Sequence, residues 1–327
     1  MRAPRSKPRR SKDRPDYSDA PIAFVTTVDR GRITCLIDGR EVTAMKAREL
    51  GKNAVVVGDL IRLDGDTSGS AGSLARAVQV IERKNLLSRT VDDVGAFEKS
   101  VAANVDQLVI VVAAADPVPR HGFVDRTLVV AYDQGIEPIL VITKCDLEDP
   151  NEFLSAYSGL EIPTFKIAAK AKSLGLANDE KEEFQMELNR LRRKLTGKKS
   201  VLIGHSGVGK STLFNALLQN EARATGDVNL ATGKGRHTSS SAYALELPSG
   251  GWIIDTPGVR SFGLEHIDRS RVVGAFAELA ELIVDCPKRC SHSEPDCALN
   301  NIPSGSEAQL RVAGLRRILA STSQPIT

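Results

Sequence analysis

Apolar and polar residues follow two different patterns along the chain. Residues 22–82 carry short apolar runs broken by turns, and such closely spaced strands are typical of a small β-barrel. We expect an oligonucleotide-binding (OB) barrel, although the composition would equally permit an SH3-like barrel. The expected barrel strands cover residues 23–28, 33–37, 54–57 and 60–63.

From residue 105 onward the pattern changes to alternating strands and helices. The uninterrupted runs Leu-Val-Ile-Val-Val and Ile-Leu-Val-Ile are typical of parallel strands that helices cover on both faces. A helical segment that carries cysteines begins beyond residue 264. We expect strands at 106–114, 138–143 and 163–168, helices at 123–134, 150–158 and 179–195, and a hairpin of 242–247 with 252–255 closed near 249–251.

Residues 201–212 read VLIGHSGVGKST and place a glycine loop between an apolar strand and a helical pattern. The glycines let the backbone curl around phosphates, so that its N–H groups and the helix N-terminus face the negative charge. In this setting Lys210 would reach the β- and γ-phosphates, and Ser211 would hold Mg²⁺ through its hydroxyl. An ordinary glycine-rich turn is the alternative.

Asp255-Thr256-Pro257-Gly258 follows the next apolar strand directly. A P-loop enzyme needs an acid there to hold Mg²⁺ through water, and a glycine whose N–H senses the γ-phosphate. Between the two motifs, Thr238 in a polar stretch is the expected Mg²⁺ and γ-phosphate ligand. Arg260 stands where Ras-like enzymes carry their water-orienting glutamine. His237 is the best replacement for positioning water, and the alternative is a solvated loop residue without a catalytic part.

Thr143-Lys144-Cys145-Asp146 ends a strand and resembles the Asn-Lys-x-Asp element with which the GTPase superfamily reads guanine. The resemblance implies that Asp146 pairs with guanine N1–H and the exocyclic amine, and that Lys144 packs on the base. Thr143 replaces the usual asparagine, which shortens or removes one brace to the P-loop. Ala168-Ala169-Lys170 stands where the superfamily has Ser-Ala-Lys, and only backbone contact to the base oxygen is expected there.

The order of these motifs differs from that of other GTPases. The base-reading elements at 143–146 and 168–170 precede the P-loop at 204–211 and the Asp-Thr-Pro-Gly turn at 255–258. We therefore expect a circularly permuted GTPase domain. A physical consequence is that the switch segment after Gly258 runs directly into the C-terminal segment, on which the γ-phosphate can pull.

Three cysteines and one histidine gather near the C-terminus in the pattern Cys-x₃-Cys-x-His-x₄-Cys. Cys₃His is a closed tetrahedral set for structural zinc, without a position for catalytic water. Chance clustering is the alternative. The expected zinc ligands are Cys286, Cys290, His292 and Cys297.

Together these features resemble the RsgA (YjeQ) family of circularly permuted GTPases over about residues 22–300. Its most specific matches are GHSGVGKST, GRHT, DTPGVRSF and the Cys/His cluster, joined by NVDQ at 104–107 and VVGD at 56–59. The resemblance implies a GTP-hydrolysing factor of late 30S ribosomal subunit maturation. Its barrel and zinc domain would contact 16S rRNA, and the small subunit would stimulate its hydrolysis.

The chain has 327 residues and a formal net charge of +3, with basic residues concentrated in residues 1–15. We expect a disordered basic arm suited to nucleic acid, or else a merely solvated tail. No apolar region suits a signal peptide or a membrane span, and a cytoplasmic location is expected. A monomer is expected as well. A GTP-sensing adaptor for a protein partner, with little catalysis of its own, is the competing function. A P-loop ATPase or small-molecule kinase is disfavoured by Asp146.

The sequence thus predicts a multidomain α/β protein with a basic arm (1–20), an OB-type barrel (21–84), a permuted GTPase domain (85–263) and a helical zinc-binding domain (264–327). Catalysis is expected from His237, Thr238 and Lys210, and Mg²⁺ binding from Ser211, Thr238 and Asp255. The expected contacts to GTP or GDP are Thr143, Lys144, Cys145, Asp146, Ala169, Lys170, Gly204, His205, Ser206, Gly207, Val208, Gly209, Lys210, Ser211, Thr212, Asp255 and Gly258.

Overall fold

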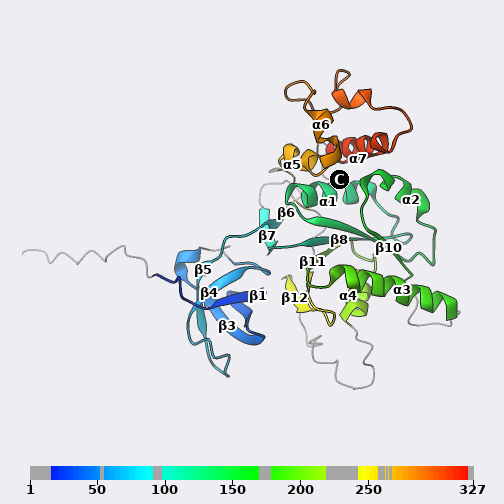
Figure 1. Cartoon of the computed structure of the whole chain (residues 1–327). Helices are drawn as coiled ribbons and strands as arrows, with labels where there is room; N and C mark the ends of the chain where they lie inside the picture. Colours follow the sequence, from blue (N-terminus) through cyan, green and yellow to red (C-terminus); the bar gives the residue numbers. More distant parts are fainter. Residues whose placement is uncertain are drawn as a thin grey trace, which may run out of the picture.

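The computed structural model describes residues 16–51, 55–90, 98–168, 178–218, 242–256, 262, 264 and 267–322. Figure 1 shows three units along the chain, namely a barrel of blue strands, a central sheet flanked by helices, and C-terminal helices in orange and red that lie over α1. Most of the expected basic arm, residues 1–15, lies outside the described residues.

The N-terminal unit is a closed barrel. Within the described residues its strand order is β1-β2-β3-β5-β4, β4 returns to pair with β1, and β3 and β5 run parallel. This closed order confirms the OB barrel rather than the SH3-like one. Alternate side chains point into the barrel core, where Cys35 is fully buried. The strands are β1 (Ile22–Asp29), β2 (Arg32–Ile37), β3 (Arg40–Lys46), β4 (Leu60–Gly65) and β5 (Ala75–Val80).

The apolar run at 55–57 is buried, but the strand expected there is wrong. Only Val57 forms an isolated bridge, to Ala102, while the Val56 N–H donates to the Asp59 carboxylate at 2.8 Å. Gly58 then turns the chain at φ 90°, and its oxygen accepts from Asn104 Nδ2 at 3.0 Å. The carboxylate that captures this backbone N–H prevents the run from continuing as a strand.

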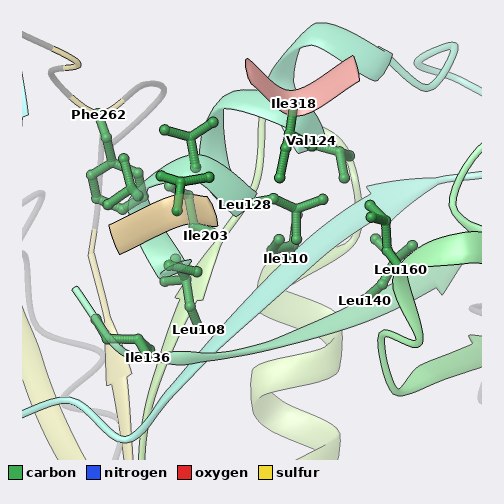
Figure 2. Packing of buried hydrophobic residues seen from close by; sticks show 14 of the residues in the cluster. Leu108, Ile110, Val124, Leu128, Ile136, Leu140, Leu160, Ile203, Phe262 and Ile318 are labelled. Atoms are coloured by element: carbon green, nitrogen blue, oxygen red, sulfur yellow. The ribbon is translucent and has the colours of Figure 1, made fainter. Parts of the chain in front are cut away.

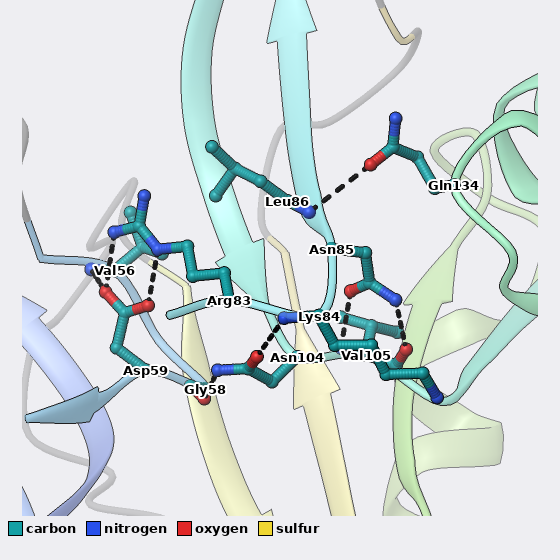
Figure 3. A network of polar contacts seen from close by, with 10 residues as sticks. All are labelled: Val56, Gly58, Asp59, Arg83, Lys84, Asn85, Leu86, Asn104, Val105 and Gln134. Carbon is teal, nitrogen blue, oxygen red and sulfur yellow. Dashed lines mark hydrogen bonds and ion pairs between the residues drawn. The ribbon is translucent and has the colours of Figure 1, made fainter. Parts of the chain in front are cut away.

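The two sequence stretches 56–59 and 104–107 therefore meet at the junction between the barrel and the central sheet (Figure 3). Arg83 binds the buried carboxylate of Asp59 with two hydrogen bonds, from Nε to Oδ1 at 2.7 Å and from Nη2 to Oδ2 at 2.8 Å. Beside this junction, β6 (Leu86–Thr90) and β7 (Glu98–Ala103) form an antiparallel pair in a region where the sequence analysis expects no strands.

The central sheet continues in the order β10-β9-β8-β11-β13-β12, parallel except for β12. Every residue of β8 is buried, as expected for a strand covered on both faces. Figure 1 shows α1 and α2 on one face of the sheet and α3 and α4 on the other. The elements are β8 (Gln107–Ala113), α1 (His121–Asp133), β9 (Glu137–Thr143), α2 (Asn151–Ser155), the 3₁₀ turn η2 (Ser158–Leu160), β10 (Thr164–Ile167), α3 (Asn178–Leu195), β11 (Lys199–Ile203), α4 (Lys210–Leu218), β12 (Tyr243–Glu246) and β13 (Trp252–Asp255).

The barrel joins the central sheet edge to edge. Thr27 of β1 lies opposite Tyr243 of β12, so that one hydrogen-bonded sheet runs through both units. Beside this bridge, the Phe24 ring packs on Trp252 with centroids 4.8 Å apart. The position of the barrel is thereby tied to the hairpin that carries Asp255.

The C-terminal helices pack on α1 and η2. Arg317 of α7 pairs with Asp125 of α1 at 3.0 Å, and Ile318 belongs to the apolar cluster that includes Val124 and Leu128 (Figure 2). None of the described helices is both long and apolar enough to cross a membrane. The elements are α5 (Arg269–Gly274), η3 (Ala277–Leu279), α6 (Ala280–Ile283), η4 (Ala298–Asn301) and α7 (Glu307–Ser321).

Candidate functional site

Three predicted motifs meet at the carboxyl edge of the parallel strands. Residues 143–146 follow β9, the glycine loop at 204–209 follows β11, and Asp255 ends β13. Crevices beyond the carboxyl ends of parallel strands are where open α/β sheets bind their ligands. The fold therefore assembles the described part of the expected nucleotide site.

The glycine loop has the backbone that a phosphate cradle needs. Gly207 and Gly209 have φ values of 84° and 83°, in the region that side chains other than glycine rarely enter. A Cβ on Gly204 would lie 2.5 Å from the carbonyl oxygen of Val111, so only glycine fits there. The loop delivers Lys210 as the first residue of α4, and the helix N-terminus faces the same edge.

Lys210 and Asp255 form an ion pair at the centre of the site, with Nζ 2.9 Å from Oδ1. The second carboxylate oxygen, Oδ2, accepts a hydrogen bond from the Tyr243 hydroxyl at 3.3 Å. Burial, followed by the charge of Asp255, raises the pKa of Tyr243 to about 12, so the hydroxyl keeps its proton at neutral pH. The side chain of Thr256 fixes the strand end by donating to the oxygen of Leu202 at 3.1 Å.

Thr143 braces the base-reading element against the glycine loop. Its Oγ1 donates to the Val208 carbonyl at 2.6 Å and lies 3.3 Å from the carbonyl of Val112. Of the two expected outcomes for this position, the brace is therefore shortened rather than lost. Thr143 is almost fully buried, so bulk solvent does not compete for this contact.

The rest of the base-reading element is more open. Lys144 has φ 56° and its Nζ donates to the carbonyl of Asp116, while Asp146 is exposed at the same edge. The half-buried Cys145 thiol contacts the carbonyl of Ile142 at 3.3 Å, and burial raises the pKa of this thiol. This thiol stays protonated and is unsuited to nucleophilic chemistry.

A cavity of about 260 Å³ lies beside the glycine loop, lined by His205 and Ser206 from one side and by Pro117 and Arg120 from the other. The His205 ring packs on the ring of Phe123 of α1, with the ring centroids 4.5 Å apart. A larger cavity of about 520 Å³ lies between α2, β10 and α3, and no motif residue among those the structure describes lines it. The smaller cavity is the one that belongs to the site.

The cysteine–histidine cluster of the C-terminal segment is assembled. Ligand atoms of Cys286, Cys290, His292 and Cys297 all lie within 4.8 Å of one another. The Cys286 and Cys297 sulfurs are 3.8 Å apart, and His292 Nδ1 is 3.7 Å from the Cys286 sulfur. Sulfur atoms held at roughly 2.3 Å from one tetrahedral ion would be about 3.8 Å apart. This group could hold a metal ion.

Surrounding residues hold the cluster in shape. Glu294 accepts the Ser291 N–H at 2.9 Å, and Arg316 of α7 donates to the His292 carbonyl at 2.6 Å. His292 itself has φ 67°, a conformation that such loop contacts must stabilise. These contacts orient the expected ligands and connect them to α7.

Five predicted site residues lie outside the described residues, namely Ala169, Lys170, His237, Thr238 and Gly258. Conversely, sequence reasoning missed Tyr243 and the residues opposite the glycine loop. The sequence could have indicated Tyr243, because pairing residues outward from the predicted turn near 249–251 places Tyr243 opposite Asp255. The loop that contributes Arg120 carries no motif that could have indicated it.

Comparisons with known proteins agree with this architecture. The family model described as RsgA GTPase matches residues 80–265. A protein of Pseudomonas aeruginosa named small ribosomal subunit biogenesis GTPase RsgA is 38% identical over 277 residues, which cover 82% of this chain and 76% of that protein. A protein of the same name from Pseudomonas syringae is 34% identical over 303 residues, with 87% and 82% covered.

Solved structures extend the likeness to the whole fold. YjeQ from Thermotoga maritima matches with a TM-score of 0.60 and 26% identity over 91% of this chain and 98% of that chain. YloQ, described as a circularly permuted GTPase, matches in fold with a TM-score of 0.59 and 21% identity over 92% and 96%. The site and fold thus define a circularly permuted P-loop GTPase. The chain belongs to the RsgA GTPase family.

Proposed function

We propose that this GTPase acts in late maturation of the 30S ribosomal subunit, where it binds 16S rRNA and the subunit stimulates its hydrolysis of GTP. The observation that carries the proposal is the meeting of the glycine loop, Asp255 and the base-reading element at one sheet edge. Membership of a family whose relatives are named for small-subunit biogenesis supplies the process.

In the proposed phosphate site, the backbone of 204–209 and the start of α4 bind the phosphates through N–H groups. Lys210, which pairs with Asp255 in this structure, turns to the β- and γ-phosphates when GTP binds. Ser211 and Asp255 offer the hard oxygen ligands that magnesium prefers, directly and through water. Bound Mg²⁺ would neutralise charge that develops on the phosphates during transfer.

In the proposed base site, Asp146 accepts hydrogen bonds from the guanine N1–H and exocyclic amine, which adenine does not offer there. Lys144 covers the base with its stem, Cys145 contributes backbone, and Ala169 and Lys170 approach the base oxygen. Exposure of Asp146 in this structure leaves its carboxylate accessible to a base.

For hydrolysis, we propose that His237 positions the attacking water and that Thr238 contacts magnesium and the γ-phosphate. Gly258 would sense that phosphate through its N–H. A His237→Ala variant should bind GTP like wild type and hydrolyse it far more slowly in the presence of its partner. Normal stimulated hydrolysis by this variant would remove the role of His237.

We further propose that the metal in the Cys₃His cluster is one structural zinc ion per chain. The donor set of three sulfurs and one imidazole suits zinc and leaves no open position. Its release should unfold the surrounding segment rather than change the chemistry at the phosphates.

The proposed RNA surface combines the barrel, the C-terminal unit and the basic arm. An OB barrel is a common nucleic-acid platform, and salt-sensitive binding to rRNA is expected because phosphate contacts dominate such interfaces. We propose a cytoplasmic monomer with the four units bounded at 1–20, 21–84, 85–263 and 264–327. A GTP-sensing adaptor for a protein partner is the competing function. Binding of a partner that does not depend on RNA would favour it.

The deciding experiment measures GTP hydrolysis by the pure protein alone, with 30S subunits and with 50S subunits. Strong stimulation by 30S subunits alone is expected. Slow hydrolysis that neither particle changes would leave a GTPase and contradict the ribosome-triggered mechanism. The same assay with ATP is the specificity control, since Asp146 should discriminate against adenine.

A further inference from the structure

Both oxygens of the Asp255 carboxylate already have partners. Lys210 Nζ donates to Oδ1 at 2.9 Å, and the Tyr243 hydroxyl donates to Oδ2 at 3.3 Å. The Asp255 side chain is only 14% exposed, so these two contacts rather than bulk water set the plane of the carboxylate.

Three elements fix the tyrosine itself. Its backbone lies opposite Asp255 on β13 on one side and opposite Thr27 of the barrel on the other. Its ring meets Phe214 of α4 edge-on, with centroids 5.8 Å apart and an interplanar angle of 79°. A strand paired on both sides and a packed ring leave the hydroxyl little freedom, which is how a supporting residue holds a functional group in place.

The two partners of Asp255 differ in what GTP does to them. On the proposed function, Lys210 leaves Oδ1 for the phosphates, which opens that oxygen toward the magnesium ion and its water. A tyrosine hydroxyl carries no positive charge for the phosphates to attract and is not a strong magnesium ligand, so GTP and Mg²⁺ give Tyr243 no reason to leave Asp255. The hydrogen bond to Oδ2 therefore outlasts the ion pair.

We propose that Tyr243 is the positioning residue of Asp255, and that its hydroxyl holds Oδ2 so that Oδ1 faces the magnesium side of the nucleotide. The inference rests on the proposed role of Asp255 in magnesium binding. It adds that the barrel takes part, because the same tyrosine is bridged to Thr27.

The test uses Tyr243→Phe, which removes the hydroxyl and keeps the ring contact with Phe214. The affinity of full-length protein for a fluorescent GDP analogue is measured with Mg²⁺ and with EDTA. Substitution of residues that orient metal-binding groups typically changes metal affinity by 10–100-fold. Here we expect the ratio of the affinities with Mg²⁺ and with EDTA to fall about tenfold. Affinity in EDTA should be unchanged, because the hydroxyl acts only through Asp255.

Tyr132→Phe is the matched control, since Tyr132 lies in α1 against Phe276 and away from Asp255. It should keep the full Mg²⁺ effect. In an Asp255→Asn background, Tyr243→Phe should have no further effect if the two residues act as one unit.

Equal losses of affinity in Mg²⁺ and in EDTA would show a merely structural tyrosine and overturn the inference. An unchanged Mg²⁺ effect in Tyr243→Phe, with a normal effect in wild type, would overturn it as well. If wild type binds the analogue without any Mg²⁺ dependence, the role of Asp255 is wrong and the inference falls with it. The wild-type measurement therefore separates the two failures.

Discussion

The Thr143 hydroxyl donates a hydrogen bond of 2.6 Å to the carbonyl oxygen of Val208, and so joins the base-reading element to the glycine loop. Thr143 ends β9 and Val208 lies in the loop after β11, and the two residues are separated by 65 positions in the chain. A threonine thus performs through a short hydroxyl what a longer asparagine side chain would do. Gly209 beside it leaves room, since a Cβ there would lie 3.4 Å from Thr143 Oγ1.

Removal of this brace should weaken nucleotide binding. Thr143→Val keeps the shape of the side chain but leaves the buried Val208 carbonyl without its donor, which costs about 1 kcal/mol. We expect roughly fivefold weaker GDP binding. Titration of fluorescent GDP into both proteins measures this difference.

Thr164→Val is the matched control for that experiment. Thr164 also donates to a main-chain carbonyl, that of Ile162 at 2.9 Å, but it lies on the edge strand β10. Its replacement should leave GDP affinity unchanged. Equal weakening by both variants would mean that the hydroxyl at position 143 has no particular role at the glycine loop.

Sequence patterning predicted those elements whose side chains repeat with a clear period. The apolar run at 108–113 in β8 and the turn of the β12–β13 hairpin are examples, and both lie where expected. It failed at 55–57, where three apolar residues suggested a strand but Asp59 captures the Val56 N–H. Apolarity alone cannot reveal that a carboxylate three residues further along the chain accepts a backbone N–H, nor that Arg83 holds this carboxylate in place.

The candidate site shows the same division. Lys210, Asp255 and Asp146 were predicted because phosphate, magnesium and guanine chemistry requires those residue types in motifs. The contribution of Tyr243 follows only from strand register, and that of Arg120 only from how two loops fold together. Motifs therefore identify the residues that contact a ligand better than the residues that hold those contacting residues in position.

Close packing of α7 on η2 makes one glycine sensitive to substitution. A Cβ on Gly159 would collide with the backbone of Leu310 in α7. Gly159→Ala should therefore push α7 outward and lower the free energy of unfolding by about 1–3 kcal/mol. Thermal or denaturant unfolding measures this loss.

Gly274→Ala is the control, because nothing lies within 4 Å of a Cβ at that position at the end of α5. Alanine is the better helix former, so this variant should be neutral or more stable by up to about 1 kcal/mol. A Gly159→Ala protein as stable as wild type would contradict the close contact between η2 and α7.

The ion pair of Arg317 with Asp125 should make stability depend on pH. Burial is the main cause that raises the pKa of Asp125, and Arg317 is the main group that opposes it. His121 and Tyr157 are the other titratable groups that face this carboxylate. A carboxyl group whose pKa is raised on folding holds its proton more tightly in the folded state, so stability falls as pH rises through that pKa.

Arg317→Ala removes the opposing charge and leaves a buried carboxylate. We expect a loss of about 3 kcal/mol at pH 7.5 and a smaller loss at pH 5.5, because Asp125 then takes up a proton. Urea unfolding of wild type and variant at both pH values gives the two differences. Arg271→Ala, which removes an arginine that is 62% exposed in its pairs with Asp133 and Asp268, should cost less than about 1 kcal/mol at either pH.

Removal of the metal should act on the C-terminal segment and spare the sheet. Metal binding to thiolates and imidazole is coupled to the folding of the segment that carries them, so the segment 286–301 should lose order once a chelator takes the ion. Hydrogen exchange should show loss of protection in 286–301 and retained protection in β8 and β9.

The cysteine variants test the same site by composition. Cys290→Ser should lose the single bound metal ion in elemental analysis, whereas Cys145→Ser should retain it, because the Cys145 thiol faces the Ile142 carbonyl. Metal loss in both variants, or protection lost equally from β8, would contradict a closed site confined to this segment.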